Sequence, residues 1–421
     1  MPADVAAHKT TYRHSAFGLL IAGQVTSKLG HAVFLIVLTL YLKQLTDSAR
    51  VLGAAQFLSY LPALLLGPFA GVLVDRFDRK RLLVGSDLAR GAAIMLVAAA
   101  ARYGGAATVV LLFVLAALVS ICQAVFLPTV QALLPDVVPP QRLRSRNAVR
   151  GAGVQLANLA GNAAGGMLFA AFGGPVVLLY TGVTFLLSAA QEQLIRVPRR
   201  PPRAHAAGIG AQTVSALRYV RVRPGVAAAV VTHGVVGLSF PPLLLALPFV
   251  VMDDLGLPES FFGFYLAAVL AGGILGYLWF GSIRSHRVPE RTLLLAGFML
   301  LALGVSAAGV WMQPIPLFPA FTAAGLGAGM VNLALVTALQ RSTPSARRGR
   351  VFGLYESTAA AASALGFALA GPLVDLFRDR LSVLVLAVGI ALILYWARLL
   401  WSPAVKKLVQ SPGASSARES M

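Results

Sequence analysis

Cysteine and acidic residues are scarce in this sequence. Cys122 is the only cysteine among 421 residues, which excludes an intramolecular disulfide and a thiolate metal cluster. Charged residues make up 12% of the chain, whereas soluble globular proteins carry about 25%. The 6 histidines are scattered, with no acid or cysteine at ligand spacing, so no metal site and no cofactor are expected. These shortages exclude an ordinary soluble domain and one held together by disulfides or metals.

Apolar residues, in contrast, reach 58% and gather in long stretches. A helix needs about 20 apolar residues to cross the hydrocarbon core of a bilayer. The twelve transmembrane helices predicted from these stretches lie at 15–42, 50–74, 82–102, 106–134, 148–172, 175–195, 225–251, 261–283, 292–312, 315–340, 351–374 and 381–402. The expected fold class is an all-α polytopic membrane protein.

Basic residues alternate between the loops. The tails and loops on one side of the predicted helices hold 27 Lys and Arg, and the loops on the other side hold 5. Segments rich in Lys and Arg stay in the cytoplasm during insertion. The asymmetry predicts a multi-pass protein of the plasma (inner) membrane with both termini cytoplasmic. It also explains the net charge of +20 without a nucleic-acid partner, because the arginines form no stripe interleaved with aromatic residues.

The longest polar interruption predicts a boundary between two halves. The expected organisation is a cytoplasmic tail (1–14), a six-helix bundle (15–195), a cytoplasmic central loop (196–224), a second six-helix bundle (225–402) and a cytoplasmic tail (403–421). Within the central loop, apolar positions at helical spacing predict a short helix on the membrane surface over 209–223. A solvated linker is the alternative.

The two halves repeat each other weakly. The matching positions are Leu52-Gly53 with Phe262-Gly263, and Pro140, Arg144 and Arg146 with Pro344, Arg348 and Arg350. Internal repeats are the usual construction of secondary transporters, in which the substrate binds between the halves near the bilayer midplane. The repeat therefore predicts two bundles in a pseudo-twofold arrangement.

The segment 71–81 reads Gly-Val-Leu-Val-Asp-Arg-Phe-Asp-Arg-Lys-Arg. It resembles the signature loop of the major facilitator superfamily and departs from it at Asp78, where glycine is usual. The resemblance implies that this loop latches the two halves on the cytoplasmic side when the central cavity opens outward. The latch residues that it implies are Gly67, Gly71, Asp75, Arg76, Arg79 and Lys80, with Arg348, Arg350 and Glu356 as candidate partners. The alternative is that the basic residues only fix the topology.

Further strings resemble one efflux branch of that superfamily. They are Phe126-Leu127-Pro128, Ala132-Leu133-Leu134-Pro135-Asp136, Leu143 and Asn147-Ala148 in the first half, and Leu339-Gln340, Pro344 and Arg348-Gly349-Arg350-Val351 in the second. The branch contains macrolide-efflux-like and enterobactin-exporter-like proteins, and the resemblance covers about 15–400. It implies a secondary transporter, monomeric as is usual in the superfamily, and says nothing about the substrate.

Small residues mark the predicted helix 148–172. Proton-coupled exporters of the superfamily carry a small-residue motif there, with Gly-Pro where Gly161-Asn162 stands in this sequence. The candidate motif residues are Gly161, Asn162, Gly165 and Gly166. Close helix packing through small residues is the alternative.

Polar side chains within the predicted spans are candidates for the transport site. Gln24, Lys28 and His31 share one face of the helix 15–42, at spacing i, i+4, i+7. A lysine at a helix centre costs about 2.5–3.5 kcal/mol on insertion scales, so it should face a watery cavity or a partner. In the superfamily the first, fourth, seventh and tenth helices line the cavity. By that analogy the companions are Gln123, His233 and Asn332.

His31 is the candidate proton carrier, because histidine changes charge near neutral pH. Many relatives have an acid at this position, and the alternative is a histidine that only forms hydrogen bonds. Asp87 and Arg90, at spacing i, i+3, are expected to form a structural pair. Glu192 is expected at the membrane interface, and Glu356 at the start of its helix, where a carboxylate is favourable.

These observations predict a secondary active transporter rather than an enzyme. No P-loop and no phosphorylation-type aspartate sequence is present that would indicate an ATP-driven pump. The predicted activity is proton-coupled export of small amphiphilic molecules, such as drugs, siderophores or secondary metabolites, by alternating access. The expected partners are thus the substrate, protons and the lipid bilayer. An importer or a flippase for lipid-like substrates on the same fold is the alternative, and a non-transporting membrane receptor or scaffold is a remote one.

Overall fold

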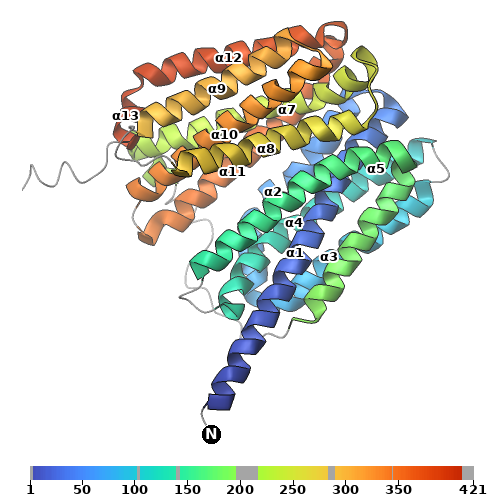
Figure 1. The fold of residues 1–421 in the computed structure, drawn as a ribbon, viewed down its shortest axis with the longest axis vertical. Coiled ribbons are helices and arrows are strands. Elements are labelled where there is room, and N and C mark those ends of the chain that lie inside the picture. The colour runs from blue at the N-terminus through green and yellow to red at the C-terminus, as the bar shows by residue number, and fades with distance from the viewer. Residues whose placement is uncertain are drawn as a thin grey trace, which may run out of the picture. The chain divides into compact units, whose positions relative to one another are not determined.

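The computed structural model describes the backbone of residues 3–101, 105–138, 143–195, 217–282, 290–343 and 345–409, and every regular element in these ranges is a helix (Figure 1). The long helices are α1 (Ala3–Thr46), α2 (Ala49–Arg76), α3 (Arg79–Ala100), α4 (Gly105–Val137), α5 (Leu143–Gln193), α7 (Pro224–Phe249), α8 (Ser260–Ser282), α9 (Glu290–Val310), α10 (Pro314–Ser342), α11 (Ser345–Leu376) and α12 (Leu381–Trp401). The short ones are η3 (Val250–Asp254), η4 (Arg378–Arg380) and α13 (Pro403–Val409). The all-α prediction is confirmed.

Ten helices among the described residues are long and apolar enough to cross a membrane. One of them, α5, joins the predicted helices 148–172 and 175–195 across a break at Gly173, where φ is 73° and ψ is 170°. Glycine adopts this conformation without the steric cost of a Cβ. Counting the two arms of α5 separately, and adding α2, gives the twelve predicted helices.

Several helices extend beyond their predicted ends, and one short helix was not predicted. α1 begins at Ala3 rather than at residue 15, and α11 begins at Ser345 rather than at 351. In the segment expected to be a tail, 403–409 form α13, whose Val405 is buried. Hydropathy detects only the apolar part of a helix, whereas alanine, lysine and arginine extend it readily into polar sequence.

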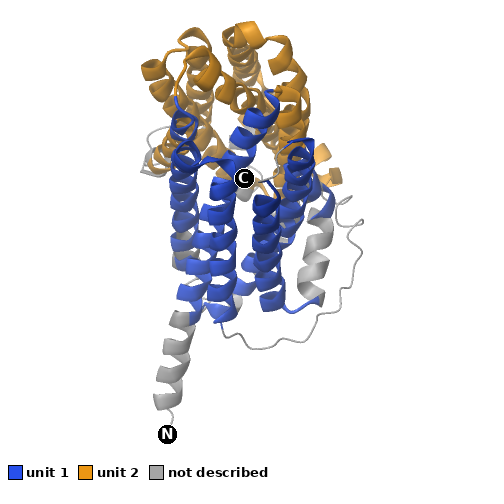
Figure 2. Cartoon of the chain, turned by 90° about the vertical axis from the view of Figure 1, so that its right-hand side faces the viewer, with its two compact units in different colours: residues 1–47, 58–205, 258–264 blue, residues 48–57, 206–257, 265–421 orange. Residues whose placement is uncertain are grey.

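The chain divides into two compact units (Figure 2). Unit 1 contains 1–47, 58–205 and 258–264, and unit 2 contains 48–57, 206–257 and 265–421. The start of α2 is thus counted with unit 2, and the start of α8 with unit 1. Most of the central loop, 196–216, lies outside the described residues. The surface helix predicted over 209–223 is therefore described only at 217–222, which are helical.

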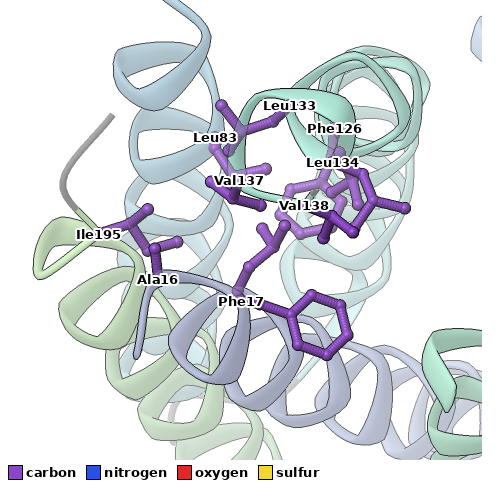
Figure 3. Close-up of a cluster of buried hydrophobic side chains, with 11 residues drawn as sticks. Ala16, Phe17, Leu83, Phe126, Leu133, Leu134, Val137, Val138 and Ile195 are labelled. Carbon is purple, nitrogen blue, oxygen red and sulfur yellow. The ribbon is translucent and has the colours of Figure 1, made fainter. Parts of the chain in front are cut away.

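In unit 1, α1 and α3 pack against α5, and α4 packs against α3 and α1. At one end of these helices lies a cluster of buried apolar side chains: Ala16, Phe17, Leu20, Leu83, Phe126, Val130, Leu133, Leu134, Val137, Val138 and Ile195 (Figure 3). Because α3 begins and α4 and α5 end here, the cluster ties four helices together at that end of the unit. Next to this cluster, the same four helices carry the group of buried polar side chains described below.

Unit 2 is built on the helix pairs α7–α11, α9–α10 and α9–α12. A Cβ added at Gly304 of α9 would lie 2.8 Å from the carbonyl oxygen of Ala320 on α10, so only glycine permits this approach. Trp396 of α12 donates a hydrogen bond to the carbonyl oxygen of Leu295 on α9, at 2.9 Å. Close packing of this kind stabilises helix pairs in lipid, where the hydrophobic effect does not drive association.

Candidate functional site

The polar core of unit 1 is an ion pair between Asp87 and Arg90, one turn apart on α3. Both side chains are completely buried, with 0% of their surface exposed. Nη2 of Arg90 donates to Oδ1 of Asp87, and the hydroxyl of Ser27 on α1 donates to the same oxygen at 3.2 Å. The expected pair is present, and it also ties α3 to α1.

The other donors of the Arg90 guanidinium are used as well. Nε donates to the carbonyl oxygen of Ser86 at 3.3 Å, and Nη1 donates to Oε1 of Gln123 on α4 at 2.7 Å. The guanidinium carbon lies 4.5 Å from the ring centroid of Phe126 and 4.6 Å from that of Phe185. A planar, weakly hydrated guanidinium suits such a site, because it stacks on aromatic rings and donates in several directions.

The predicted polar face of α1 lies close to this pair. Gln24 is buried, and its Oε1 has no hydrogen-bond partner among the described residues. Lys28 and His31 are partly exposed and lie within electrostatic reach of Arg90. Nδ1 of His31 is buried without a hydrogen-bond partner in the described part of the chain. The residue of α1 that bonds directly to the pair is Ser27, which was not among the predicted site residues.

Glu192, which was expected at the membrane interface, lies at the end of α5, where its depth in a membrane stays a prediction. Its side chain is completely buried (0% exposed) against Gly23 of α1, where an added Cβ would meet Cγ of Glu192 at 2.8 Å. One turn earlier, Ser188 donates to the carbonyl oxygen of Gly23 at 2.7 Å. Neither carboxyl oxygen of Glu192 has a hydrogen-bond partner within the described residues. The missing Cβ of Gly23 gives the space in which α1 covers this acid.

A periodic signal in the sequence could have identified Glu192. Thr181, Thr184, Ser188 and Glu192 follow one another at spacings of three and four residues, and all four are buried. Polar side chains on one face of an apolar helix point toward neighbouring helices rather than lipid. Because Glu192 stands at the end of the predicted span, its contact with neighbouring helices was not expected. Ile195, three residues further along the chain, is also buried and belongs to the cluster in Figure 3.

Unit 2 carries a second polar group, which brings together the predicted residues His233 and Asn332. The ring of His233 on α7 stacks on Tyr355 of α11, with centroids 3.8 Å apart and an interplanar angle of 2°. The Tyr355 hydroxyl donates to Oδ1 of Asn332 on α10 at 3.0 Å. Nδ2 of Asn332 donates to the hydroxyl of Tyr277 on α8 at 2.7 Å. Neither tyrosine was predicted, because a single tyrosine in an apolar span gives no periodic signal.

The sequence and this architecture match a known family. The family model described as "Transmembrane secretion effector" matches residues 7–414. The chain belongs to this family of the major facilitator superfamily. The resemblance inferred from the signature loop and the efflux-branch strings is therefore confirmed.

Relatives of this major facilitator protein include efflux proteins. Macrolide efflux protein A of Streptococcus pyogenes is 23% identical over 376 residues, covering 87% of this chain and 90% of that protein. Multidrug efflux pump Tap of Mycobacterium tuberculosis (strain ATCC 25618 / H37Rv) is 29% identical over 401 residues, covering 91% and 92%. A solved bacterial homologue of the human lysosomal transporter Spinster, inward-facing and unoccupied, has a TM-score of 0.76 at 16% identity, covering 96% and 99%. The family and its named relatives are transporters, not enzymes.

The signature loop of this major facilitator protein joins α2 to α3. The surroundings of Gly67, Gly71, Asp75 and Arg76, and of the candidate partners Arg348 and Arg350, lie outside the described residues. Arg79 and Lys80 begin α3 and are partly exposed. Asp78, which departs from the superfamily pattern, is the N-cap of α3 and accepts a hydrogen bond from the backbone N–H of Arg81 at 2.9 Å. The departure thus has a structural use, because N-cap carboxylates satisfy free helix donors.

Glu356 was expected to begin its helix, and this prediction is wrong. α11 begins at Ser345, about three turns earlier, because the basic segment 345–350 is helical too. The side chain of Glu356 is exposed and follows Tyr355 of the second polar group. A role of Glu356 as latch partner stays a prediction.

The small residues of α5 pack against α1 in unit 1. A Cβ added at Gly161 would lie 2.7 Å from Cβ of Ala32, and one at Gly165 would lie 2.9 Å from Cβ of Ile36. Both distances are shorter than real Cβ contacts allow. Glycine at these positions therefore sets the distance between the two helices.

The next position along the helix in each case, Asn162 and Gly166, faces the start of α8 instead. A Cβ added at Gly166 would lie 3.0 Å from the carbonyl oxygen of Glu259 and from the backbone nitrogen of Gly263. A Cβ added at Gly263 would lie closer still to the carbonyl oxygen of Asn162. The four candidate motif residues thus lie in helix contacts, and their part in proton-coupled export stays a prediction.

Proposed function

We propose that this transporter exports small amphiphilic molecules from the cytoplasm (drugs, siderophores or secondary metabolites) and that inward proton movement drives the export. Relatives named for macrolide efflux and multidrug efflux support the direction and the substrate class. The bundles would expose one substrate site to each side in turn. The 27 Lys and Arg on one side against 5 on the other support cytoplasmic termini in the plasma (inner) membrane. A monomer is the usual state in the superfamily.

The observation that carries proton coupling is the buried ionic group of unit 1. Asp87, Arg90 and Glu192 are buried in helices of membrane-spanning length. Ionisable side chains buried within transmembrane helices are costly and mark ion pathways or proton relays. A polar core that served packing alone would need no acid beyond the one that pairs with Arg90.

The polar group of unit 2 supports an amphiphilic substrate. His233 and Tyr355 present aromatic rings, and Asn332 contributes one amide in otherwise apolar helices. Sites for drug-like molecules combine a largely apolar lining with a few placed polar groups. A sugar would need many more hydrogen-bonding side chains.

Uptake into everted membrane vesicles tests this proposal. Vesicles with and without the protein are acidified inside, and the uptake of ethidium and of the macrolide erythromycin is followed before and after a protonophore is added. We expect uptake that depends on the protein and stops with the protonophore. Uptake that continues after the protonophore contradicts proton coupling. Accumulation of both probes in intact cells, rather than depletion, contradicts export and favours the importer.

A further inference from the structure

The buried acids of unit 1 outnumber the cation that bonds to them. The Arg90 guanidinium is occupied by Asp87, by Ser27 at 3.4 Å from Nη2, and by the acceptors on α3 and α4. The aromatic rings of Phe126 and Phe185 also lie against it. Asp87 and Arg90 therefore form a neutral, almost fully satisfied pair, and Glu192 is a second acid that bonds to neither.

The surroundings of Glu192 favour a neutral side chain. Both of its carboxyl oxygens are buried and without a hydrogen-bond partner in the described residues. A buried carboxylate that lacks donors loses its hydration without compensation, whereas a protonated carboxyl carries no charge to stabilise. Oδ2 of Asp87 is likewise without a hydrogen-bond partner among the described residues, because the nearby hydroxyl of Ser188 donates to the carbonyl oxygen of Gly23.

Within the described part of the chain, the ionisable groups of Glu192's surroundings and of the Asp87–Arg90 pair come from α1, α3 and α4. Asp87 and Arg90 on α3 lie within electrostatic reach of it. The other ionisable groups near the pair are Lys28 and His31 on α1 and Cys122 on α4. A proton on Glu192 leaves one carboxylate beside one guanidinium, and its loss leaves two carboxylates competing for that guanidinium.

We propose that Glu192 is the residue that binds and releases the coupled proton, and that Arg90 is the positioning residue that passes this charge change to the neighbouring helices. The inference rests on the proposed proton-coupled export and assigns to Glu192 the role that was predicted for His31. The proton moves between a carboxyl oxygen of Glu192 and water, and no other bond forms or breaks. Because Arg90 is bonded to Ser27 on α1 and Gln123 on α4, a pull on its guanidinium acts on both helices.

Infrared spectroscopy of the purified protein tests proton binding without any substrate. The C=O absorption of a protonated buried carboxyl is followed while the pH is raised, in the wild type and in Glu192→Gln. The control is Glu259→Gln, the same chemical change at an acid at the start of α8, outside the cluster. We expect a titrating band in the wild type and in the control that is missing in Glu192→Gln. An unchanged titration in Glu192→Gln overturns the proposal.

Transport in proteoliposomes tests coupling. Glu192→Gln should retain ethidium counterflow, because counterflow needs no net proton movement. Under a pH gradient the variant should accumulate at least tenfold less ethidium than the wild type. Gradient-driven accumulation at the wild-type level overturns the assignment to Glu192. If the wild type itself shows counterflow but no gradient-driven accumulation, the proposed proton coupling fails, and the infrared titration still decides whether Glu192 binds a proton.

Glu192→Asp keeps the test decisive if the glutamine variant does not fold. Aspartate preserves an ionisable carboxyl and moves it by one methylene. We expect gradient-driven transport to persist with its pH profile displaced by half a unit or more. A profile identical to that of the wild type overturns the proposal.

Discussion

Arg90 of α3 and Gln123 of α4, 33 residues apart, meet through a 2.7 Å hydrogen bond inside unit 1. The same guanidinium holds Asp87 on its own helix and Ser27 on α1. One side chain thus joins three helices.

Arg90→Ala should destabilise the protein by about 3–5 kcal/mol, because it leaves the buried Asp87 without its partner. Adding Asp87→Asn to an Arg90→Met variant should recover part of this loss, since the unpaired charge is then gone. Thermal unfolding of the purified protein in detergent measures both effects. Arg398→Ala, at an exposed position on α12, is the matched control and should unfold like the wild type. Equal unfolding midpoints for the Arg90 and Arg398 variants would contradict the pair's role.

Two glycines of α5 should respond oppositely to the same substitution. Gly161→Ala places a methyl group against Ala32 and should cost about 1–3 kcal/mol. Gly151→Ala places it in open space and should stabilise the helix by up to about 1 kcal/mol. The difference in unfolding midpoint between the two variants measures the effect. A loss of the same size in both would show that α5 does not pack closely on α1 at Gly161.

Tyr355→Phe should weaken transport by disturbing Asn332. The variant removes the donor to Oδ1 of Asn332, a hydrogen bond of about 0.5–1.5 kcal/mol, and keeps the stacked ring. If this group binds substrate, the half-saturating ethidium concentration for export should rise by about 2–10-fold. Tyr395→Phe removes a comparable bond to Thr232 and serves as the control, with the half-saturating concentration unchanged. Equal shifts in both variants would place the substrate site elsewhere.

Substitutions of two acids in the signature loop should have different effects, on stability at Asp78 and on export at Asp75. Asp78→Ala removes the N-cap of α3 and should cost about 0.5–2 kcal/mol, whereas Asp78→Asn should retain most of that stability. Asp75→Asn should instead slow export at least tenfold at nearly unchanged stability if Asp75 latches the bundles. Export rates and unfolding midpoints of the three variants give the comparison. A normal export rate of the Asp75→Asn variant would contradict the role of Asp75 as a latch.

His31→Gln distinguishes the two candidate proton carriers. If Glu192 binds the coupled proton, the pH dependence of ethidium export should keep its shape in His31→Gln and flatten in Glu192→Gln. The measurement is the initial rate of export at a fixed pH gradient and varying absolute pH. A flattened profile in the His31 variant alone would return the role to His31.

Much of the fold could be predicted, because membrane insertion depends on properties that are local in the sequence. Hydropathy located all the spans. It missed helix ends such as Ser345 and the short helix α13, since polar residues continue a helix without adding hydropathy. The break at Gly173 fell between two predicted helices, as a glycine with positive φ should.

The site could be predicted only in part, because side-chain partners depend on contacts between distant segments. Spacing on one helix grouped Asp87 with Arg90, but no spacing shows that Gln123 lies opposite them. The sequence placed Glu192 at the end of a span but could not show that the space left by Gly23 of α1 encloses its side chain. The tyrosines that bond to Asn332 lie on α8 and α11, and nothing in the sequence shows that these helices meet α10 at Asn332.

The most direct test of the account measures proton movement driven by substrate alone. Proteoliposomes with a pH-sensitive dye inside, equal pH on both sides and a membrane potential clamped at zero receive external ethidium. The account predicts that ethidium entry through the wild-type protein makes the interior alkaline, because each inward substrate is exchanged for outward protons. It also predicts no such change in protein-free vesicles or with Glu192→Gln. Ethidium entry through the wild-type protein without any change of internal pH would contradict proton-coupled export.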